Sequence, residues 1–147
     1  MPSNTPANTV SAVKLSLQQL LNQYRQGRRD FHGVDLSACD LSGLILIDID
    51  FSYANLSSAD LSGTDLQWAK LRSVNLVKAN LSRANLHRSI LRHANLTEAI
   101  LVGANLRAAD FSGARLASAD LAQADLWGAI APEGRPLRRQ RSPALFR

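Results

Sequence analysis

The chain has 147 residues, and its 17 Lys and Arg against 12 Asp and Glu give a formal net charge of +5. This length predicts one domain, and no apolar stretch approaches the roughly 18 residues that a membrane-spanning helix needs. The N-terminus shows no basic segment followed by an apolar block, so we predict no secretory signal and a cytoplasmic protein. A single cysteine, Cys39, excludes an internal disulfide and is expected to be a buried core thiol.

A capping helix is predicted at residues 11–27, after a flexible N-terminus at residues 1–10. Its apolar face recurs with helical spacing and consists of Val13, Leu17, Leu20, Leu21 and Tyr24. The candidate N-cap residues are Asn8, Thr9 and Ser11. Gly27 fits the position just after the last turn. Because an open end of stacked strands exposes backbone and apolar side chains, we expect this helix to cover the repeats that follow.

A five-residue repeat occupies residues 28–131. Every fifth residue from Phe31 to Leu126 is Leu or Phe. The residue before it is most often Asp or Asn, and the one before that is most often small, as in Ala54-Asn55-Leu56-Ser57-Ser58. Neither a helix of period 3.6 nor a strand of period 2 sustains this spacing, so the pattern predicts a repeat architecture with its own geometry.

These repeats, such as Ala59-Asp60-Leu61-Ser62-Gly63, resemble the pentapeptide repeat family. The lead-in at residues 20–31 and the closing segment at residues 128–134 resemble those of cyanobacterial members. The resemblance implies an all-β solenoid, a right-handed quadrilateral β-helix of about five coils, in which four pentapeptides form one square coil. With the predicted helix, this gives a β-helix with an N-terminal α-helical cap. In that geometry Leu or Phe points inward, and Asp or Asn bonds local backbone amides.

The segment after the repeats differs in composition. Three turn-forming residues follow the last coil, namely Pro132, Gly134 and Pro136. A basic cluster comes next, formed by Arg138, Arg139 and Arg141. We predict a basic, disordered tail at residues 132–147, with folding back over the last coil as the alternative.

Charge is unevenly distributed along the repeats. Residues 30–65 carry seven acids and no base, whereas residues 70–92 carry six bases and no acid. Because residues twenty apart would stack on neighbouring coils, the unusual side chains gather on one face and its corner. We predict a partner-binding surface there, the basic face, formed by Trp68, Lys70, Arg72, His87, Arg88, Arg92 and Arg107. Trp68 would lie below Arg88 in cation–π contact, and no acid is expected to offset these bases.

No catalytic, cofactor-binding or metal-binding residues are predicted. The glycines occur singly rather than in a phosphate-binding loop. The histidines form no ligand set with Cys39, and the pair Asp48 and Asp50 is better explained by turns. We therefore expect a protein that is not an enzyme and that binds no cofactor.

The leading hypothesis is a non-enzymatic protein-interaction or scaffold module, with a regulatory role as one option. Its partner would be a protein with an acidic surface. Nucleic-acid binding through the basic middle coils and tail is the alternative, although no series of stacking aromatics accompanies the bases. The family also contains gyrase-interacting quinolone-resistance proteins that mimic DNA through an acidic surface. The basic middle of this chain argues against that role, and the oligomeric state is left open.

Overall fold

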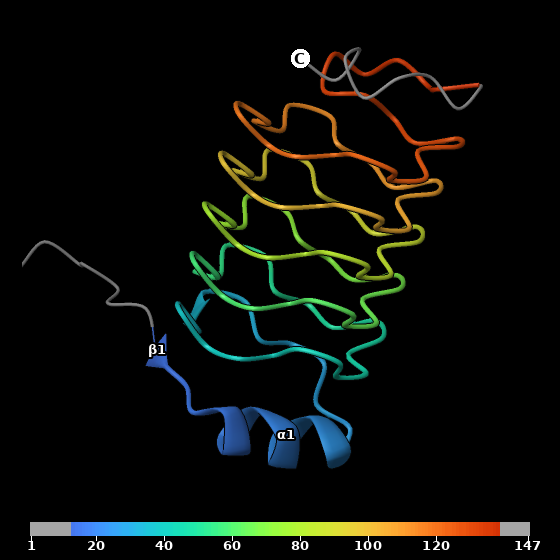
Figure 1. Cartoon of the computed structure of the whole chain (residues 1–147). Helices are drawn as coiled ribbons and strands as arrows, with labels where there is room; N and C mark the ends of the chain where they lie inside the picture. Colours follow the sequence, from blue (N-terminus) through green and yellow to red (C-terminus); the bar gives the residue numbers. More distant parts are fainter. Residues whose placement is uncertain (1–12, 139–147) are drawn as a thin grey trace, which may run out of the picture.

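The computed structural model describes residues 13–138. Figure 1 shows a stack of coils that rises from one short helix. The regular elements are β1 (Val13–Lys14), α1 (Leu17–Arg25) and β2 (Val34–Asp35), and β1 pairs with β2 in parallel. The predicted flexible segment at residues 1–10 lies outside the described residues. Within residues 13–138, no helix has the length and apolar character needed to cross a membrane.

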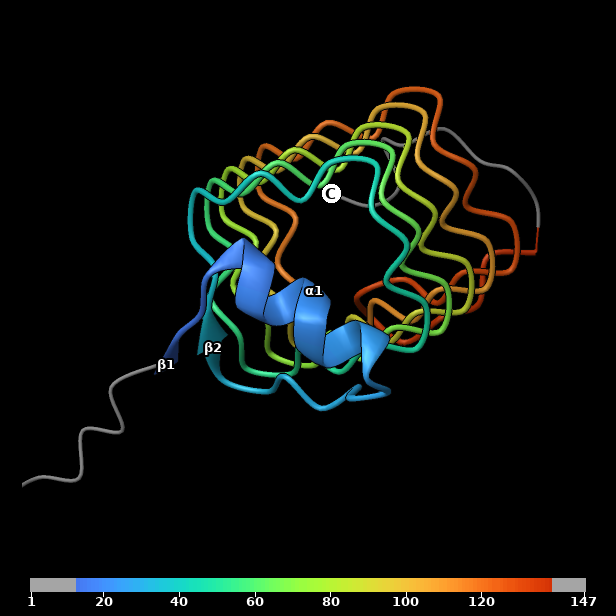
Figure 2. The same cartoon turned by 90° about the horizontal axis from the view of Figure 1, so that it is seen from below.

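Each coil pairs with the next through residues twenty positions apart. Asp30 forms a parallel bridge with Asp50, and Asp50 forms one in turn with Lys70. Backbone hydrogen bonds also join neighbouring coils. For example, the Phe51 N–H donates to the Lys70 carbonyl of the next coil at 2.8 Å. Four pentapeptides therefore complete one coil, and the end-on view in Figure 2 shows its four-sided outline. This spacing confirms the coil length that the resemblance implied.

The central Leu and Phe side chains fill the interior of the stack. Leu81, in the middle of the repeats, is 0% exposed. The small residues two positions earlier are buried beside these side chains, and two of them carry hydroxyls. Thr64 Oγ1 donates to the Leu41 carbonyl at 2.8 Å, and Ser89 Oγ donates to the Leu86 carbonyl at 2.8 Å. Because both hydroxyls are hydrogen-bonded, they are accommodated in an otherwise apolar core.

Where Asp or Asn precedes the central residue, its side chain fixes the turn that follows. Asp60 Oδ1 accepts a hydrogen bond from the Ser62 N–H at 2.9 Å, and Asn80 Oδ1 accepts one from the Ser82 N–H at 3.0 Å. The Ser82 hydroxyl also donates to Asn80 Oδ1, at 2.6 Å. These contacts confirm that the acidic and amide side chains bond local backbone amides.

The second residue after each central Leu or Phe has a positive φ. This holds for glycines such as Gly63, with φ of 64°, and for large residues such as Trp68, with φ of 62°. A side chain in this left-handed region costs about 1–2 kcal/mol, because its Cβ crowds the following carbonyl oxygen. The coil compensates by hydrogen bonding, since the Trp68 N–H donates to the His87 carbonyl of the next coil at 3.0 Å.

Gly63→Ala should lower the free energy of unfolding by about 1–2 kcal/mol. A Cβ at Gly63 would meet no other atom within 4 Å, so the cost would come from the backbone conformation alone. Chemical denaturation measures the difference. Ala38→Gly, at φ of 57°, is the reverse change at the same turn position and should not destabilise the protein. An unchanged free energy of unfolding for Gly63→Ala would show that this turn does not hold the positive φ.

Helix α1 begins at Leu17, later than the sequence analysis predicts. Its N-cap is Ser16, whose Oγ accepts from the Gln19 N–H at 3.2 Å, while Gln19 Oε1 accepts from the Ser16 N–H at 2.9 Å. This reciprocal pair is a capping box, so the three predicted N-cap residues were wrong. The predicted start was too early because Val13 belongs to β1 and is 66% exposed rather than on the helix face. Gly27 follows the last turn with φ of 97°, as predicted.

Helix α1 lies across the N-terminal end of the stack (Figure 2). Leu20 is fully buried, and the Tyr24 hydroxyl donates to the Ile47 carbonyl of the first coil at 2.9 Å. Leu44, also in the first coil, packs against the core and is partly buried. Cys39 was expected to be buried but is partly exposed, because the first coil has a neighbouring coil on one side only.

The chain folds back after the last coil. The Leu137 N–H donates to the Ala129 carbonyl at 2.7 Å, and the Gly128 N–H donates to the Leu137 carbonyl at 2.8 Å. The Leu137 side chain packs against the core. For residues 132–138 the predicted disorder is therefore wrong, because the last coil offers backbone partners and apolar surface to this segment. The remainder of the predicted tail, residues 139–147, lies outside the described residues.

Candidate functional site

The basic face is built from turn residues of successive coils. The Trp68 N–H donates to the His87 carbonyl at 3.0 Å, and the Arg88 N–H donates to the Arg107 carbonyl at 3.0 Å. These bonds place the side chains of one coil beside those of the next, at the spacing of about 4.8 Å between hydrogen-bonded strands. The structure thus brings together four of the seven residues predicted for this surface.

Trp68 is the centre of this group. The Arg88 guanidinium lies over its ring, 4.8 Å from the ring centroid, which confirms the predicted cation–π contact. The His87 ring meets Trp68 edge-on, with centroids 6.5 Å apart. The His87 Nδ1 atom is buried and has no hydrogen-bond partner among the described residues. Trp68 nevertheless stays 48% exposed and accessible to a partner.

A second Trp–Arg pair extends the face by one coil. The Arg107 guanidinium lies 4.7 Å from the centroid of the Trp127 ring, and Trp127 is 52% exposed. Trp127 was not among the predicted site residues. The spacing of twenty between Arg107 and Trp127 was the signal that would have identified it.

Two of the bases are offset by acids, contrary to prediction. Arg92 Nε donates to Asp110 Oδ2 at 2.6 Å, and Arg107 Nη1 donates to Asp125 Oδ2 at 3.2 Å. Both acids lie on the next coil, eighteen residues along the chain, so counting charges within one stretch of sequence misses them. Burial raises the pKa of Asp110, but hydrogen bonds from Ser112 and Arg92 outweigh it and lower that pKa overall. Asp110 therefore stays ionised beside Arg92.

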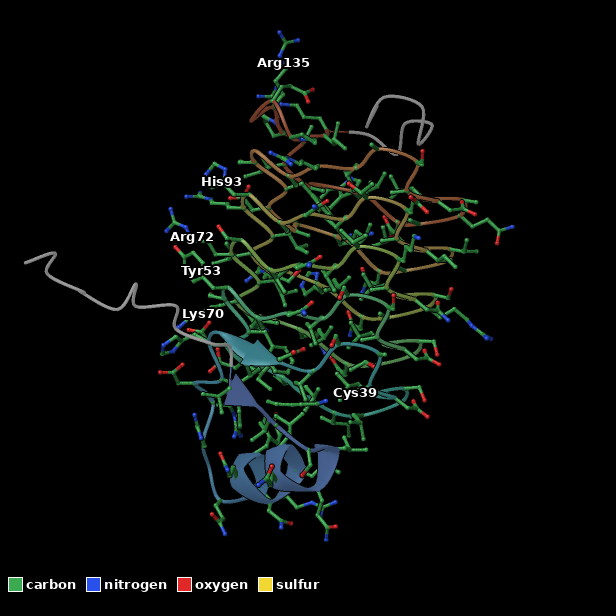
Figure 3. The ribbon with its side chains drawn as sticks, turned by 90° about the vertical axis from the view of Figure 1, so that its left-hand side faces the viewer. Cys39, Tyr53, Lys70, Arg72, His93 and Arg135 are labelled. Carbon is green, nitrogen blue, oxygen red and sulfur yellow. The ribbon has the colours of Figure 1, made fainter. Side chains whose placement is uncertain are left out.

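The remaining bases lie around the corner of the coil. Figure 3 shows Lys70 and Arg72 along one edge of the rod, together with Tyr53 and His93. Tyr53 is 63% exposed, and its N–H donates to the Arg72 carbonyl at 2.8 Å. Lys70 and Arg72 form no ion pair with any residue between 13 and 138. The predicted set thus divides into two parts. Trp68, His87, Arg88 and Arg107 form a Trp-containing face, and Lys70 and Arg72 form a basic edge along which Tyr53 and His93 also lie.

Comparison with protein families explains the repeat. The family model described as pentapeptide repeats matches in eight copies, over residues 30–67, 64–101 and 89–128. This chain belongs to the pentapeptide repeat family. Proteins of this family adopt a right-handed quadrilateral β-helix, in agreement with the four-sided coils in Figure 2.

Solved structures of other pentapeptide repeat proteins resemble this one. A protein from the thylakoid lumen of Arabidopsis thaliana shares 31% identity with a TM-score of 0.53, over 76% of this chain and 70% of its own. HetL, from the cyanobacterium Nostoc sp. strain PCC 7120 and involved in heterocyst differentiation regulation, shares 34% identity with a TM-score of 0.42, over 74% of this chain and 55% of its own. A further Nostoc protein shares 34% identity with a TM-score of 0.39, over 80% and 79%. No curated protein matches this sequence.

Within residues 13–138, no group of three or more His, Cys, Asp and Glu side chains lies close enough together to hold a metal ion. The distinctive surface chemistry is instead the exposed indole rings of Trp68 and Trp127, each stacked against a guanidinium group. Such a surface is suited to recognition of another molecule.

Proposed function

We propose that this protein is a non-enzymatic interaction module that binds an acidic protein through the basic face. The observation that carries the proposal is the pair of exposed indoles, each stacked on an Arg of the same face. Trp and Arg are the residues most enriched at binding hot spots. Stacking also restrains Arg88 and Arg107 before a partner arrives, which reduces the side-chain entropy lost on binding.

The charge that remains unpaired indicates the chemistry of the partner. Three bases of the predicted surface, Lys70, Arg72 and Arg88, form no ion pair with another described residue. Arg88 lies over the Trp68 ring, and Lys70 and Arg72 lie around the adjacent corner of the coil, so an acidic surface would be steered toward that indole. A rod of about five coils, closed at one end by helix α1, would hold these groups in fixed relative positions.

We retain two further expectations as part of this proposal. We propose a cytoplasmic location, which fractionation of the source cells would test. Nucleic-acid binding is the alternative function, because exposed Trp rings beside Arg could also receive stacked bases. Competition by duplex and single-stranded DNA in the binding experiment below separates the two.

Charge reversal on the basic face should weaken partner binding. The variant Arg72→Glu/Arg88→Glu replaces two exposed bases that have no internal ion pair, so it should leave the fold intact and weaken binding at least about tenfold. Arg92 is kept, because Glu at that position would face Asp110. The partner is first captured from lysate with the full chain and identified. The purified partner is then titrated against each variant, at low and at high salt.

The matched control is Lys78→Glu/Arg83→Glu, which makes the same charge change in the same coils but outside the basic face. Both control residues are exposed and occupy the same turn position as Arg88. The control should bind like the unmodified protein, with an affinity that falls as salt rises. Equal affinities for the two double variants would contradict the proposal, and displacement by DNA would favour the alternative.

A further inference from the structure

One row of the basic face has an unusual order of side chains. Asp48, Trp68 and Arg88 occupy the same turn position in three successive coils, with φ of 59°, 62° and 58°. Because the backbone conformation repeats, the three side chains leave the rod in the same direction. All three are exposed. At about 4.8 Å per coil, the row runs straight along the rod for about 10 Å.

The two ends of this row carry opposite charges that nothing within the described chain neutralises. The ion pairs within residues 13–138 join His32 to Asp30, Arg92 to Asp110 and Arg107 to Asp125. Asp48 and Arg88 take part in none of them. Arg88 is held over the Trp68 ring instead, which fixes its position but leaves its charge without a carboxylate partner. Along the rod, the row therefore presents an acidic, an aromatic and a basic side chain, and neither charge forms an ion pair within the described chain.

We infer that this row is a self-complementary contact for a second copy of the chain. A two-fold rotation about an axis that crosses the rod at the level of Trp68 exchanges the two ends of the row. It places Asp48 of each copy opposite Arg88 of the other, and the two Trp68 rings meet at the centre. Such a contact is isologous, because each residue meets its complement twice. The two rods run antiparallel in the resulting dimer.

Burial of aromatic surface and charge complementarity both favour this contact. The central indole is 48% exposed, so pairing removes aromatic surface from water at the middle of the interface, where hot spots concentrate. Gln67, the neighbour of Trp68 at the axis, is neutral and adds no repulsion. Lys70 and Arg72 belong to the next pentapeptide, around the corner of the coil, and stay outside the row. The inference rests on the proposed interaction function and names a second copy as one partner.

Sedimentation velocity of the full chain at low salt tests the inference. The unmodified protein should form a dimer as concentration rises, and added salt should weaken it. Asp48→Arg makes the row basic at both ends, and Arg88→Asp makes it acidic at both ends. Each variant alone should associate at least about tenfold more weakly, because like charges face each other across the two-fold axis. An equimolar mixture of the two should restore the dimer, because every acid then faces a base.

The same turn position elsewhere provides the control. Lys78→Asp changes charge at an exposed residue with φ of 58°, two pentapeptides away along the coil, and should leave dimerisation unchanged. Both reversals keep the fold, because Asp and Arg already occupy this turn position at residues 48 and 88. A protein that stays monomeric at every concentration overturns the inference, as does a dimer that neither reversal weakens. A monomer that still binds an acidic protein would overturn the dimer alone and leave the proposed function standing.

Discussion

Leu81→Asp should abolish the folded state in solution. Leu81 is 0% exposed at the centre of the stack, so the substitution places a carboxylate in an apolar interior without a partner. Loss of a buried Leu side chain alone costs about 2–5 kcal/mol. The desolvation of the charge adds to this, and the sum approaches the roughly 5–15 kcal/mol by which domains are stable. Circular dichroism and thermal unfolding of the full chain measure the effect.

Arg83→Asp is the matched control for this prediction. It introduces the same carboxylate in the same repeat, two residues along the chain, but at an exposed position. Its melting temperature should stay close to that of the unmodified protein, because an exposed substitution of this kind changes stability by about 0.5 kcal/mol or less. Equal melting temperatures for the two variants would mean that Leu81 does not point into the coil.

Leu20→Asp should make the protein aggregate beyond the association of the unmodified chain, while its coils stay formed. Leu20 is fully buried where helix α1 meets the first coil, and the Tyr24 hydroxyl is bonded to the same coil. A charge at Leu20 should detach the helix, which uncovers apolar side chains and an unpaired strand edge. Light scattering would detect the association, and circular dichroism would show that the repeats persist.

Gln18→Asp serves as the control for the helix. Gln18 is exposed on helix α1, so the same charge there should leave association at the level of the unmodified protein. A Leu20→Asp protein that associates no more than the unmodified protein would contradict the capping role of the helix, whereas loss of all secondary structure would show that the coils depend on it for folding.

The contacts of the basic face that join residues twenty apart could be predicted from the sequence. Trp68 and Arg88 are twenty apart, so their contact could be foreseen once four pentapeptides made a coil. The ion pair between Arg92 and Asp110 spans eighteen residues and crosses from one position of the repeat to another. The pair between Arg107 and Asp125 has the same spacing of eighteen, so comparing residues twenty apart misses both pairs. The same spacing of twenty places Trp127 beside Arg107, although Trp127 was not included among the predicted site residues.

The ends of the rod were less predictable than its middle. Inside the repeats each residue has the same neighbours as its counterparts, so one pattern describes all of them. At the N-terminal end, Val13 could belong to a helix or a strand, and pairing of β1 with β2 decided between them. At the C-terminal end, Leu137 is an isolated apolar residue in a polar segment. The backbone partners that it finds on the last coil are visible only in three dimensions.

The sequence by itself determined the repeat, the inward-facing residues and the bonding role of Asp and Asn, because only two side chains in five, the central residue and the small residue two positions before it, enter the apolar interior. The tertiary structure alone decided the backbone at the exposed turn positions. Trp68 and Arg88 have a positive φ that their own preferences oppose, and closure of the coil imposes it on every repeat. The direction of these side chains, and hence the chemistry of the exposed face, comes from stacking rather than from local sequence.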